Sequence, residues 1–264
     1  MENLKISLIQ SHLHWESPEE NLKSFGEKIK VLKKKTDLII LPEMFTTGFT
    51  MNAPALAETK ENSPALNFMR EKAAETGAVI TGSIIFREEE FYFNRLFWVN
   101  PNGSFSFYDK RHLFRMAGEH THYAPGKDKL IVLLKGWKIN PLICYDLRFP
   151  VWARNRYDNL KGWKYDLQIY VANWPQPRIR AWEILLQARA IENQCYTAGV
   201  NRVGTDGQGI EYSGHSRVSD PKGQIISSLL PGEEGIETLE LNGNELKRFR
   251  EQFPVGLDAD PFQI

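Results

Sequence analysis

The sequence predicts an α/β fold in which two sheets carry helices on their outer sides. Apolar segments of strand length alternate along the chain with segments of helical periodicity. Several strands, such as residues 38–41, are apolar at consecutive positions, which indicates a sheet covered on both faces. No linker, repeat or low-complexity stretch divides the 264 residues, so we expect one domain over residues 1–264. Its Pro/Asp-rich tail after about residue 254 is expected to be extended.

The first half of the chain contains two helix-start signals and a run of strands. Ser17-Pro18-Glu19-Glu20 is typical of a capping box with proline at the first helical position. Ser63-Pro64 starts a second expected helix, which ends before Gly77. Asn100-Pro101-Asn102-Gly103 is a strong turn signal between two strands. The expected strands of this half are residues 5–10, 38–41, 78–87, 90–99 and 105–110.

The second half begins with a long polar loop, residues 111–129, which contains three histidines and shows no clear period. Loops of this length are usually functional or mobile. After the loop, a hairpin is expected around Gly136. The expected strands are residues 130–134, 138–143, 167–171, 196–200, 215–219, 224–230 and 236–241, and the expected helices are near 150–157, 180–193 and 245–253.

The composition excludes several classes of protein. The chain is 42% hydrophobic and 25% charged, which is typical of a globular domain. Lys+Arg and Asp+Glu both number 33, so no basic excess favours a nucleic-acid or membrane surface. The first residues lack the charged head and long apolar stretch of a signal peptide, and no apolar run approaches the roughly 18–20 residues of a membrane span. The only two cysteines, Cys144 and Cys195, form no disulfide framework, so we expect a reduced, cytoplasmic protein.

Three reactive side chains stand at the ends of expected strands. Glu43 follows the strand over residues 38–41, Lys110 ends the strand that starts at residue 105, and Cys144 follows the strand that ends at residue 143. Ligands of parallel α/β sheets bind at the carboxyl ends of the strands. Taken singly, each residue type has a commoner structural explanation: a buried small cysteine, a capping glutamate and a surface lysine. Spacing alone does not prove that the three meet.

The local sequences around these residues carry more information than their spacing. The segments are Leu41-Pro42-Glu43-Met44-Phe45, Tyr108-Asp109-Lys110-Arg111-His112-Leu113-Phe114 and Ile143-Cys144-Tyr145-Asp146-Leu147-Arg148-Phe149-Pro150. They closely resemble the Glu, Lys and Cys signatures of the nitrilase (carbon–nitrogen hydrolase) superfamily and occur in that family's order. The resemblance spans most of the chain. It implies a four-layer αββα sandwich, a cysteine amide hydrolase, no metal and no organic cofactor.

A second, finer resemblance points to the bacterial omega-amidase branch of this superfamily. It is carried by Ala172-Asn173-Trp174-Pro175, Arg180-Ala181-Trp182, residues 188–194 and residues 200–204. Those enzymes hydrolyse the terminal amide of 2-oxo dicarboxylic acid monoamides, such as 2-oxoglutaramate and 2-oxosuccinamate. The alternatives are another amidase of the superfamily, acting on carbamoyl or aliphatic amides, a nitrile hydrolase, and a binding homologue without catalysis. Superfamily resemblance also implies a homodimer or a higher homo-oligomer.

The residue types suit the chemistry of amide hydrolysis. Amide carbonyls are poor electrophiles, and a thiolate at Cys144 is a strong nucleophile. We expect Lys110 to favour that thiolate by its charge and, with the backbone N–H of Tyr145, to bind the developing oxyanion. Glu43 is expected to act as the general base and acid. The resemblance places a second glutamate beside the lysine, and Glu119 is the candidate, against the alternative of a solvated loop carboxylate.

The substrate pocket is expected to include Phe45, Tyr145 and Trp174, although Trp174 could equally be an ordinary core aromatic. A substrate carboxylate needs a cation at the far end of the pocket, because an unpaired buried carboxylate is unstable. The candidates are Arg115, in the long loop, and Arg178 or Arg180, after Trp174-Pro175.

The remaining reactive residues are expected to be structural. We expect Arg148 to pair with Asp146 and Cys195 to be inert packing. Glu119-His120-Thr121-His122 contains residue types that bind zinc, but no third and fourth ligand with suitable spacing appears, so no metal site is expected.

Overall fold

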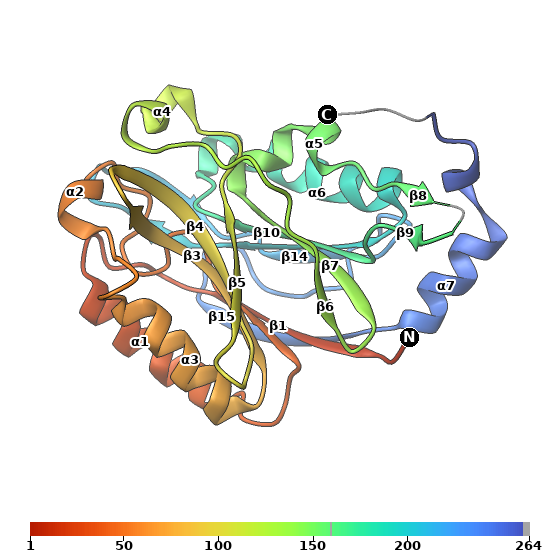
Figure 1. Cartoon of the computed structure of the whole chain (residues 1–264), viewed down its shortest axis with the longest axis horizontal. Coiled ribbons are helices and arrows are strands. Elements are labelled where there is room, and N and C mark those ends of the chain that lie inside the picture. Colours follow the sequence, from red (N-terminus) through yellow and green to blue (C-terminus); the bar gives the residue numbers. More distant parts are fainter. Residues whose placement is uncertain (159, 261–264) are drawn as a thin grey trace.

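The computed structural model describes residues 1–158 and 160–260, and it has the four-layer αββα architecture. Two large sheets pack face to face, and helices lie on the outer side of each sheet (Figure 1). The α/β class and the sandwich are therefore confirmed. Within the described residues, no helix is long and apolar enough to cross a membrane.

The first sheet has six strands in the order β15-β1-β2-β3-β4-β5. β1, β2 and β3 run parallel, and the other neighbours are antiparallel. Helices α1 (Pro18–Lys30) and α3 (Pro64–Thr76) contact each other on one side of the molecule and cover the outer face of this sheet (Figure 1). The strands are β1 (Leu4–Gln10), β2 (Leu38–Ile40), β3 (Val79–Glu88), β4 (Phe91–Val99), β5 (Phe105–Asp109) and β15 (Gly235–Leu241).

The second sheet has five strands in the order β14-β11-β10-β7-β6. Its central strands β7, β10 and β11 are parallel, and β6 and β7 form the expected hairpin. Helix α6 (Ile179–Asn193) covers the outer face, on the side of the molecule opposite α1 and α3 (Figure 1). The strands are β6 (Val132–Leu134), β7 (Trp137–Ile143), β10 (Leu167–Ala172), β11 (Tyr196–Asn201) and β14 (Arg217–Ser219).

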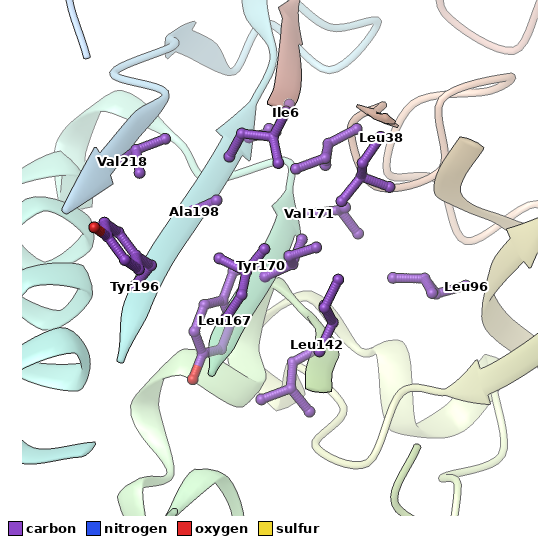
Figure 2. Close-up of a cluster of buried hydrophobic side chains, with 14 of the residues drawn as sticks. Ile6, Leu38, Leu96, Leu142, Leu167, Tyr170, Val171, Tyr196, Ala198 and Val218 are labelled. Atoms are coloured by element: carbon purple, nitrogen blue, oxygen red, sulfur yellow. The ribbon is translucent and has the colours of Figure 1, made fainter. Parts of the chain in front are cut away.

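The main core lies between the two sheets. Ile6 and Leu38 of the first sheet and Val171 and Ala198 of the second belong to one buried cluster (Figure 2). The next residue along β2, Ile39, belongs to a separate cluster under α1 and α3. Consecutive strand positions therefore face two different apolar layers, which explains why these strands are apolar without alternation.

Short elements complete the fold. Two small hairpins and several single turns of helix lie outside the two large sheets, and helix α7 follows β15. The hairpins are β8 (Tyr157–Asp158) with β9 (Gly162–Trp163) and β12 (Val203–Thr205) with β13 (Glu211–Ser213). The α-helices are α2 (Ala53–Leu56), α4 (Glu119–His122), α5 (Pro150–Ala153) and α7 (Gly243–Gln252). The 3-10 turns are η1 (Arg115–Ala117), η2 (Cys144–Arg148), η3 (Gln176–Arg178) and η4 (Val255–Leu257).

The strand expected over residues 224–230 is wrong. This segment makes one isolated bridge, from Ile225 to Ser219, and no ladder. The backbone N–H groups of Ser228 and Leu229 donate to the side chain of Glu237 instead of to a neighbouring strand. The Glu237 side chain on β15 thus takes backbone hydrogen bonds that a strand ladder would need. The local sequence pattern does not reveal this distant acceptor.

Other expected elements are shorter than the sequence indicates. The strand over 215–219 begins only at Arg217, because His215 has a left-handed φ of 56°. The helix near 150–157 ends at Ala153, beyond which the chain is extended. Ser17 precedes α1, but its side chain makes no capping hydrogen bond. The expected extended tail contains the turn η4, and its last positions, 261–264, lie outside the described residues.

Candidate active site

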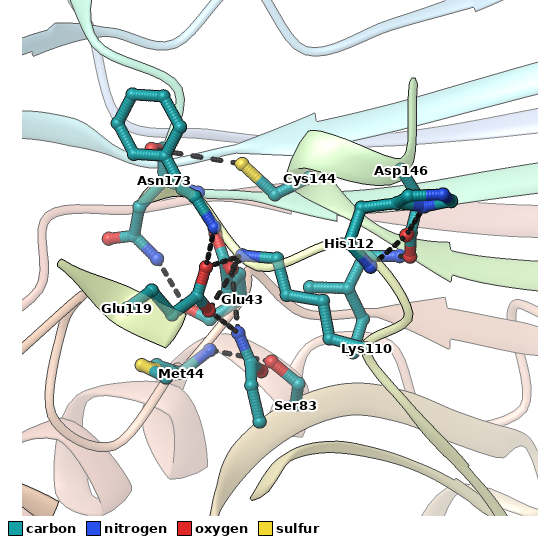
Figure 3. Close-up of polar contacts among 12 residues, drawn as sticks. Glu43, Met44, Ser83, Lys110, His112, Glu119, Cys144, Asp146 and Asn173 are labelled. Atoms are coloured by element: carbon teal, nitrogen blue, oxygen red, sulfur yellow. Dashed lines mark hydrogen bonds and ion pairs between the residues drawn. The ribbon is translucent and has the colours of Figure 1, made fainter. Parts of the chain in front are cut away.

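The topology brings Glu43 and Cys144 together. Glu43 lies just beyond the carboxyl end of β2 in the first sheet, and Cys144 follows β7 directly in the second. Lys110 follows β5, at the edge of the first sheet. All three side chains are buried and converge at one end of the sandwich, together with Glu119 from α4 (Figure 3).

Glu43 is held by donors on both carboxylate oxygens. Its Oε1 accepts hydrogen bonds from Lys110 Nζ and Asn94 Nδ2, both at 2.8 Å. Its Oε2 accepts one from the backbone N–H of Asn173 at 2.8 Å, and Asn173 Nδ2 donates to the Glu43 carbonyl at 2.5 Å. Because Asn173 follows β10 directly, the second sheet fixes the carboxylate of the first. Glu43 therefore has one orientation, which a general base requires.

Lys110 stands between two buried carboxylates. Its Nζ is 2.8 Å from Glu43 Oε1 and 2.9 Å from Glu119 Oε1. The Glu119 Oε2 also accepts the backbone N–H of Phe114 at 2.5 Å, which ties α4 to the loop after Lys110. Glu119 is thus inward-facing and fully buried, not the solvated loop carboxylate of the alternative interpretation.

The two carboxylates keep Lys110 charged. Burial by itself lowers the pKa of a lysine, but the charges of Glu119 and Glu43 outweigh burial and raise the pKa of Lys110 above its ordinary value. Burial raises the pKa of Glu119, Lys110 opposes this rise, and the Glu43 charge adds to it. The cluster contains two carboxylates and one ammonium, so one of the carboxylates can bind an additional proton.

Cys144 sits on a strained turn. Its φ is 41°, a left-handed conformation that is rare for a residue with a side chain. The turn places Sγ at the end of β7, 4.0 Å from the backbone oxygen of Asn173 (Figure 3). A nucleophile on a sharp strand-to-helix turn is presented to substrate while its backbone stays fixed.

The charge of Lys110 favours the Cys144 thiolate, in the direction expected, but burial and Glu43 outweigh it in the substrate-free enzyme. Burial and the charge of Glu43 raise the pKa of Cys144 well above its ordinary value, and Lys110 opposes this rise only in part. The Lys110 charge is already shared by two carboxylates. The resting nucleophile is therefore a neutral thiol, close enough to Glu43 for that carboxylate to raise its pKa.

A pocket opens above Sγ. Cys144, Lys110 and Asn173 line it together with aromatic and aliphatic side chains. The hairpin of β12 and β13 also contributes to the lining, and the Asp206 side chain there accepts a hydrogen bond from Tyr212 Oη at 2.9 Å. The complete lining is Phe49, Met51, Lys110, Phe114, Ala117, Cys144, Tyr145, Arg148, Asn173, Trp174, Pro175, Arg178, Asp206, Gln208, Ile210 and Tyr212.

The structure places two of the four expected substrate-binding residues on this pocket. Tyr145 and Trp174 line it. Phe45 does not: it is fully buried under α1, with its ring 5.5 Å from that of Phe25. Arg115 is exposed on η1 and lies outside the pocket lining. We therefore leave Phe45 and Arg115 out of the proposed site.

Two arginines line the pocket, the exposed Arg148 and the half-buried Arg178. The Arg178 guanidinium lies 5.2 Å from the centre of the Phe114 ring, and that of Arg148 lies 5.0 Å from the Trp174 ring. Arg180 is exposed and outside the lining. The pairing of Arg148 with Asp146 is not what the structure shows: Asp146 takes its hydrogen bonds from Tyr108, His112 and Ile143.

Several site residues were missed from the sequence. Asn94 is a buried amide within the apolar strand β4, and that contrast is a detectable signal for a polar partner in the core. The lining residues on the β12–β13 turn carry no such signal.

Cys195 is buried, 4.0 Å from Thr197 Oγ1 and outside the pocket lining. His120 and His122 are exposed whereas Glu119 faces inward, and the described residues contain no metal-binding group of three His, Cys, Asp or Glu.

Comparisons with known proteins agree with this geometry. The family model described as carbon-nitrogen hydrolase matches residues 5–251. The chain is 47% identical to omega-amidase YafV of Escherichia coli (strain K12) over all of both chains. It is 34% identical to the 2-oxoglutaramate amidase of Bacillus subtilis (strain 168) over 95% of each. The crystal structure of XC1258 from Xanthomonas campestris, a CN-hydrolase superfamily protein with an arsenic adduct in its active site, superposes with a TM-score of 0.97 at 45% identity, covering both chains completely.

Proposed function

Because the chain belongs to the carbon-nitrogen hydrolase family, we propose that it hydrolyses the terminal amide of 2-oxo dicarboxylic acid monoamides to the 2-oxo acid and ammonia. One observation carries the proposal: a buried thiol, Cys144, lines a pocket together with the buried Lys110 and two arginines. The relatives named omega-amidase and 2-oxoglutaramate amidase support this substrate class.

In the first half of the reaction, the thiol attacks the amide carbonyl carbon. Glu43 takes the thiol proton as Sγ attacks, since this carboxylate lies near enough to raise the pKa of the thiol. Lys110 Nζ and the backbone N–H of Tyr145 bind the oxyanion of the tetrahedral intermediate. Glu43 then gives its proton to the nitrogen, the C–N bond breaks, and ammonia leaves an acyl thioester on Cys144.

In the second half, water hydrolyses the thioester. Glu43 takes a proton from the attacking water, the same oxyanion donors act again, and the proton returns to the leaving sulfur. Glu119 contributes by holding Lys110 in place and charged, because its two oxygens lie 2.9 and 3.0 Å from Nζ. The cycle needs a small-molecule amide and water as its only reactants.

The arginines give the pocket its preference for an acid. A 2-oxo acid monoamide carries a carboxylate at the end remote from the scissile amide, and burial of that carboxylate requires a charged donor. Arg148 and Arg178 each pack against an aromatic ring, which fixes a guanidinium in place. We assign them to the substrate carboxylate, with Trp174 and Tyr145 enclosing the carbon chain.

The same geometry weighs against two alternatives. A binding homologue without catalysis has no need for a buried Lys110 between two carboxylates beside a thiol, because each buried charge is costly unless it is used or compensated. An amidase for neutral aliphatic amides has no need for two arginines in its pocket. The substrates compared in the next paragraph distinguish an amidase for neutral amides from the proposed hydrolase of 2-oxo acid monoamides.

We expect the protein to release ammonia from 2-oxoglutaramate or 2-oxosuccinamate at least ~100-fold faster than from butyramide, because only the former can use the arginines. Arg178→Met and Arg148→Met should each lower kcat/KM for the oxo acid amide by about 10- to 100-fold, the loss expected for a charge-assisted hydrogen bond. Activity on butyramide should stay unchanged.

Arg180→Met is the matched control, since Arg180 is a near neighbour of Arg178 in the chain but is exposed and outside the pocket lining. This variant should behave as wild type on both amides. Equal rates on charged and neutral amides, or faster turnover of a nitrile, would contradict the proposed substrate and leave the thiol chemistry intact.

The expected oligomeric state and cellular compartment remain predictions. A homodimer or a higher homo-oligomer is tested by light scattering of the purified protein. We propose a reducing, cytoplasmic environment, which suits a mechanism that requires a free thiol at Cys144; both cysteines are unpaired in the structure.

A further inference from the structure

Behind the pocket, a fully buried carboxylate joins the segment of the lysine to that of the cysteine. Asp146 Oδ2 accepts hydrogen bonds from Tyr108 Oη at 2.8 Å and from the Ile143 N–H at 3.1 Å. Its Oδ1 accepts the His112 N–H at 3.0 Å and lies 2.7 Å from His112 Nδ1. Asp146 is outside the pocket lining, so it does not touch substrate.

The partners of Asp146 bracket both functional residues. Tyr108 stands two positions before Lys110 and His112 two positions after it, while Ile143 directly precedes Cys144. One carboxylate therefore holds the Tyr108 side chain before the lysine, the His112 backbone after it, and the backbone N–H that precedes the strained turn.

Each partner is itself oriented. His112 lies beside Asp146 (Figure 3). Its ring stacks on Phe149, with ring centroids 3.7 Å apart and planes 4° from parallel. Since a carboxylate only accepts, the proton between His112 and Asp146 resides on Nδ1. Burial, together with the charge of Asp146, raises the pKa of Tyr108, so its hydroxyl remains a donor. Trp152 Nε1 donates to the same hydroxyl at 3.1 Å.

We propose that Asp146 and His112 are positioning residues, which set the distance between the Lys110 ammonium and the Cys144–Tyr145 turn and thereby assemble the oxyanion site from two separate sheets. Lys110 comes from the edge of the first sheet and Cys144 from the second, and main-chain hydrogen bonding within a sheet cannot fix their separation. The Asp146 side chain makes that link. Displacement of about 1 Å in such a site costs on the order of a hundredfold in rate.

Two substitutions of His112 separate hydrogen bonding from packing. His112→Phe keeps a ring that can stack on Phe149 and loses the Nδ1 donor. His112→Asn loses the ring and keeps an N–H donor at the same position along the side chain. His120→Phe is the matched control, because His120 is an exposed histidine of the same loop. The readouts are kcat and KM for 2-oxoglutaramate and, independently of any substrate, the rate of Cys144 alkylation by iodoacetamide.

The proposal predicts that His112→Phe lowers kcat by about 10- to 100-fold with KM within about twofold of wild type, and slows alkylation in parallel. His112→Asn should retain most of both rates, and His120→Phe all of both. If kcat and the alkylation rate of His112→Phe equal or exceed those of His112→Asn, the ring acts only by packing and the proposal is overturned. Wild-type kcat and alkylation rates in both His112 variants would also overturn the proposal.

Two provisions keep the outcome interpretable. If His112→Phe fails to fold, Tyr108→Phe keeps its ring and loses the other side-chain donor to Asp146, and the same loss in kcat without a change in KM is expected. The kcat readout rests on the proposed amide hydrolysis. If wild type releases no ammonia but alkylation still follows the predicted order of variants, the proposed substrate is wrong and the positioning role stands.

Discussion

Cys144→Ala is expected to abolish ammonia release, with a fall in kcat of at least ~10⁴-fold. Within the described residues, no other cysteine and no serine or threonine lines the pocket, and the thioester cannot form without Sγ. Alanine tolerates the left-handed φ of 41° no worse than cysteine, so the melting temperature should change little. Ammonia release by coupled assay and a thermal melt measure the two quantities.

Cys195→Ala is the matched control for this variant. Cys195 is a fully buried cysteine that lies outside the pocket, whereas Cys144 lines it. It should retain nearly full activity. A Cys144→Ala protein that still turns over, or a Cys195→Ala protein that does not, would show that the nucleophile has been misassigned.

Lys110→Met is expected to lower kcat by ~1000-fold or more and also to destabilise the protein. The substitution removes an oxyanion donor, an effect of ~100- to 1000-fold by itself. It also leaves Glu43 and Glu119 buried side by side without a cation, so one of them takes up a proton and the base is impaired. Removing one partner of a buried ion pair costs about 3–5 kcal/mol of stability, which a thermal or urea melt can detect.

Glu119→Gln provides the comparison. It keeps the side-chain shape, leaves Lys110 paired with Glu43, and should be milder than Lys110→Met in both activity and stability. Wild-type kinetics for Lys110→Met would contradict the proposed role of the ammonium. A larger loss for Glu119→Gln than for Lys110→Met would move the essential proton transfer from Glu43 to Glu119.

The sequence predicted the reactive residues because their positions follow from topology. Glu43 and Cys144 each come directly after an apolar strand, and the carboxyl ends of β2 and β7 meet at one end of the sandwich. The local motifs then identified Lys110 and Glu119, which periodicity alone could not connect to them. Asn94 could have been found as the one amide within the apolar run of β4.

Proximity within a motif was a poor guide to the pocket. Phe45 is two positions from Glu43, but Met44 between them has a φ of 43°, and the chain turns so that the Phe45 ring packs under α1. Arg115 follows the lysine motif and is exposed on η1. Conversely, part of the pocket lining comes from Asp206 to Tyr212, on a short hairpin with no motif of its own. Such contacts depend on the packing of distant segments, which no local pattern encodes.

The protonation state of Cys144 also lay beyond the sequence. The motifs show that a lysine and a glutamate accompany the cysteine, but the sign of the net effect depends on burial and on distances. In the structure the ammonium is already shared by two carboxylates, so burial and Glu43 dominate and the thiol is neutral at rest.

Trapping the acyl-enzyme tests the central claim most directly. Enzyme mixed with 2-oxoglutaramate is quenched in acid within a single turnover, digested, and the peptides are weighed by mass spectrometry. The mechanism predicts that the peptide containing Cys144 gains the mass of the 2-oxoglutaryl group as a thioester, that hydroxylamine removes this group, and that the peptide containing Cys195 is unmodified. Release of ammonia with no adduct on Cys144 at any quench time, or with the adduct on another residue, would contradict it.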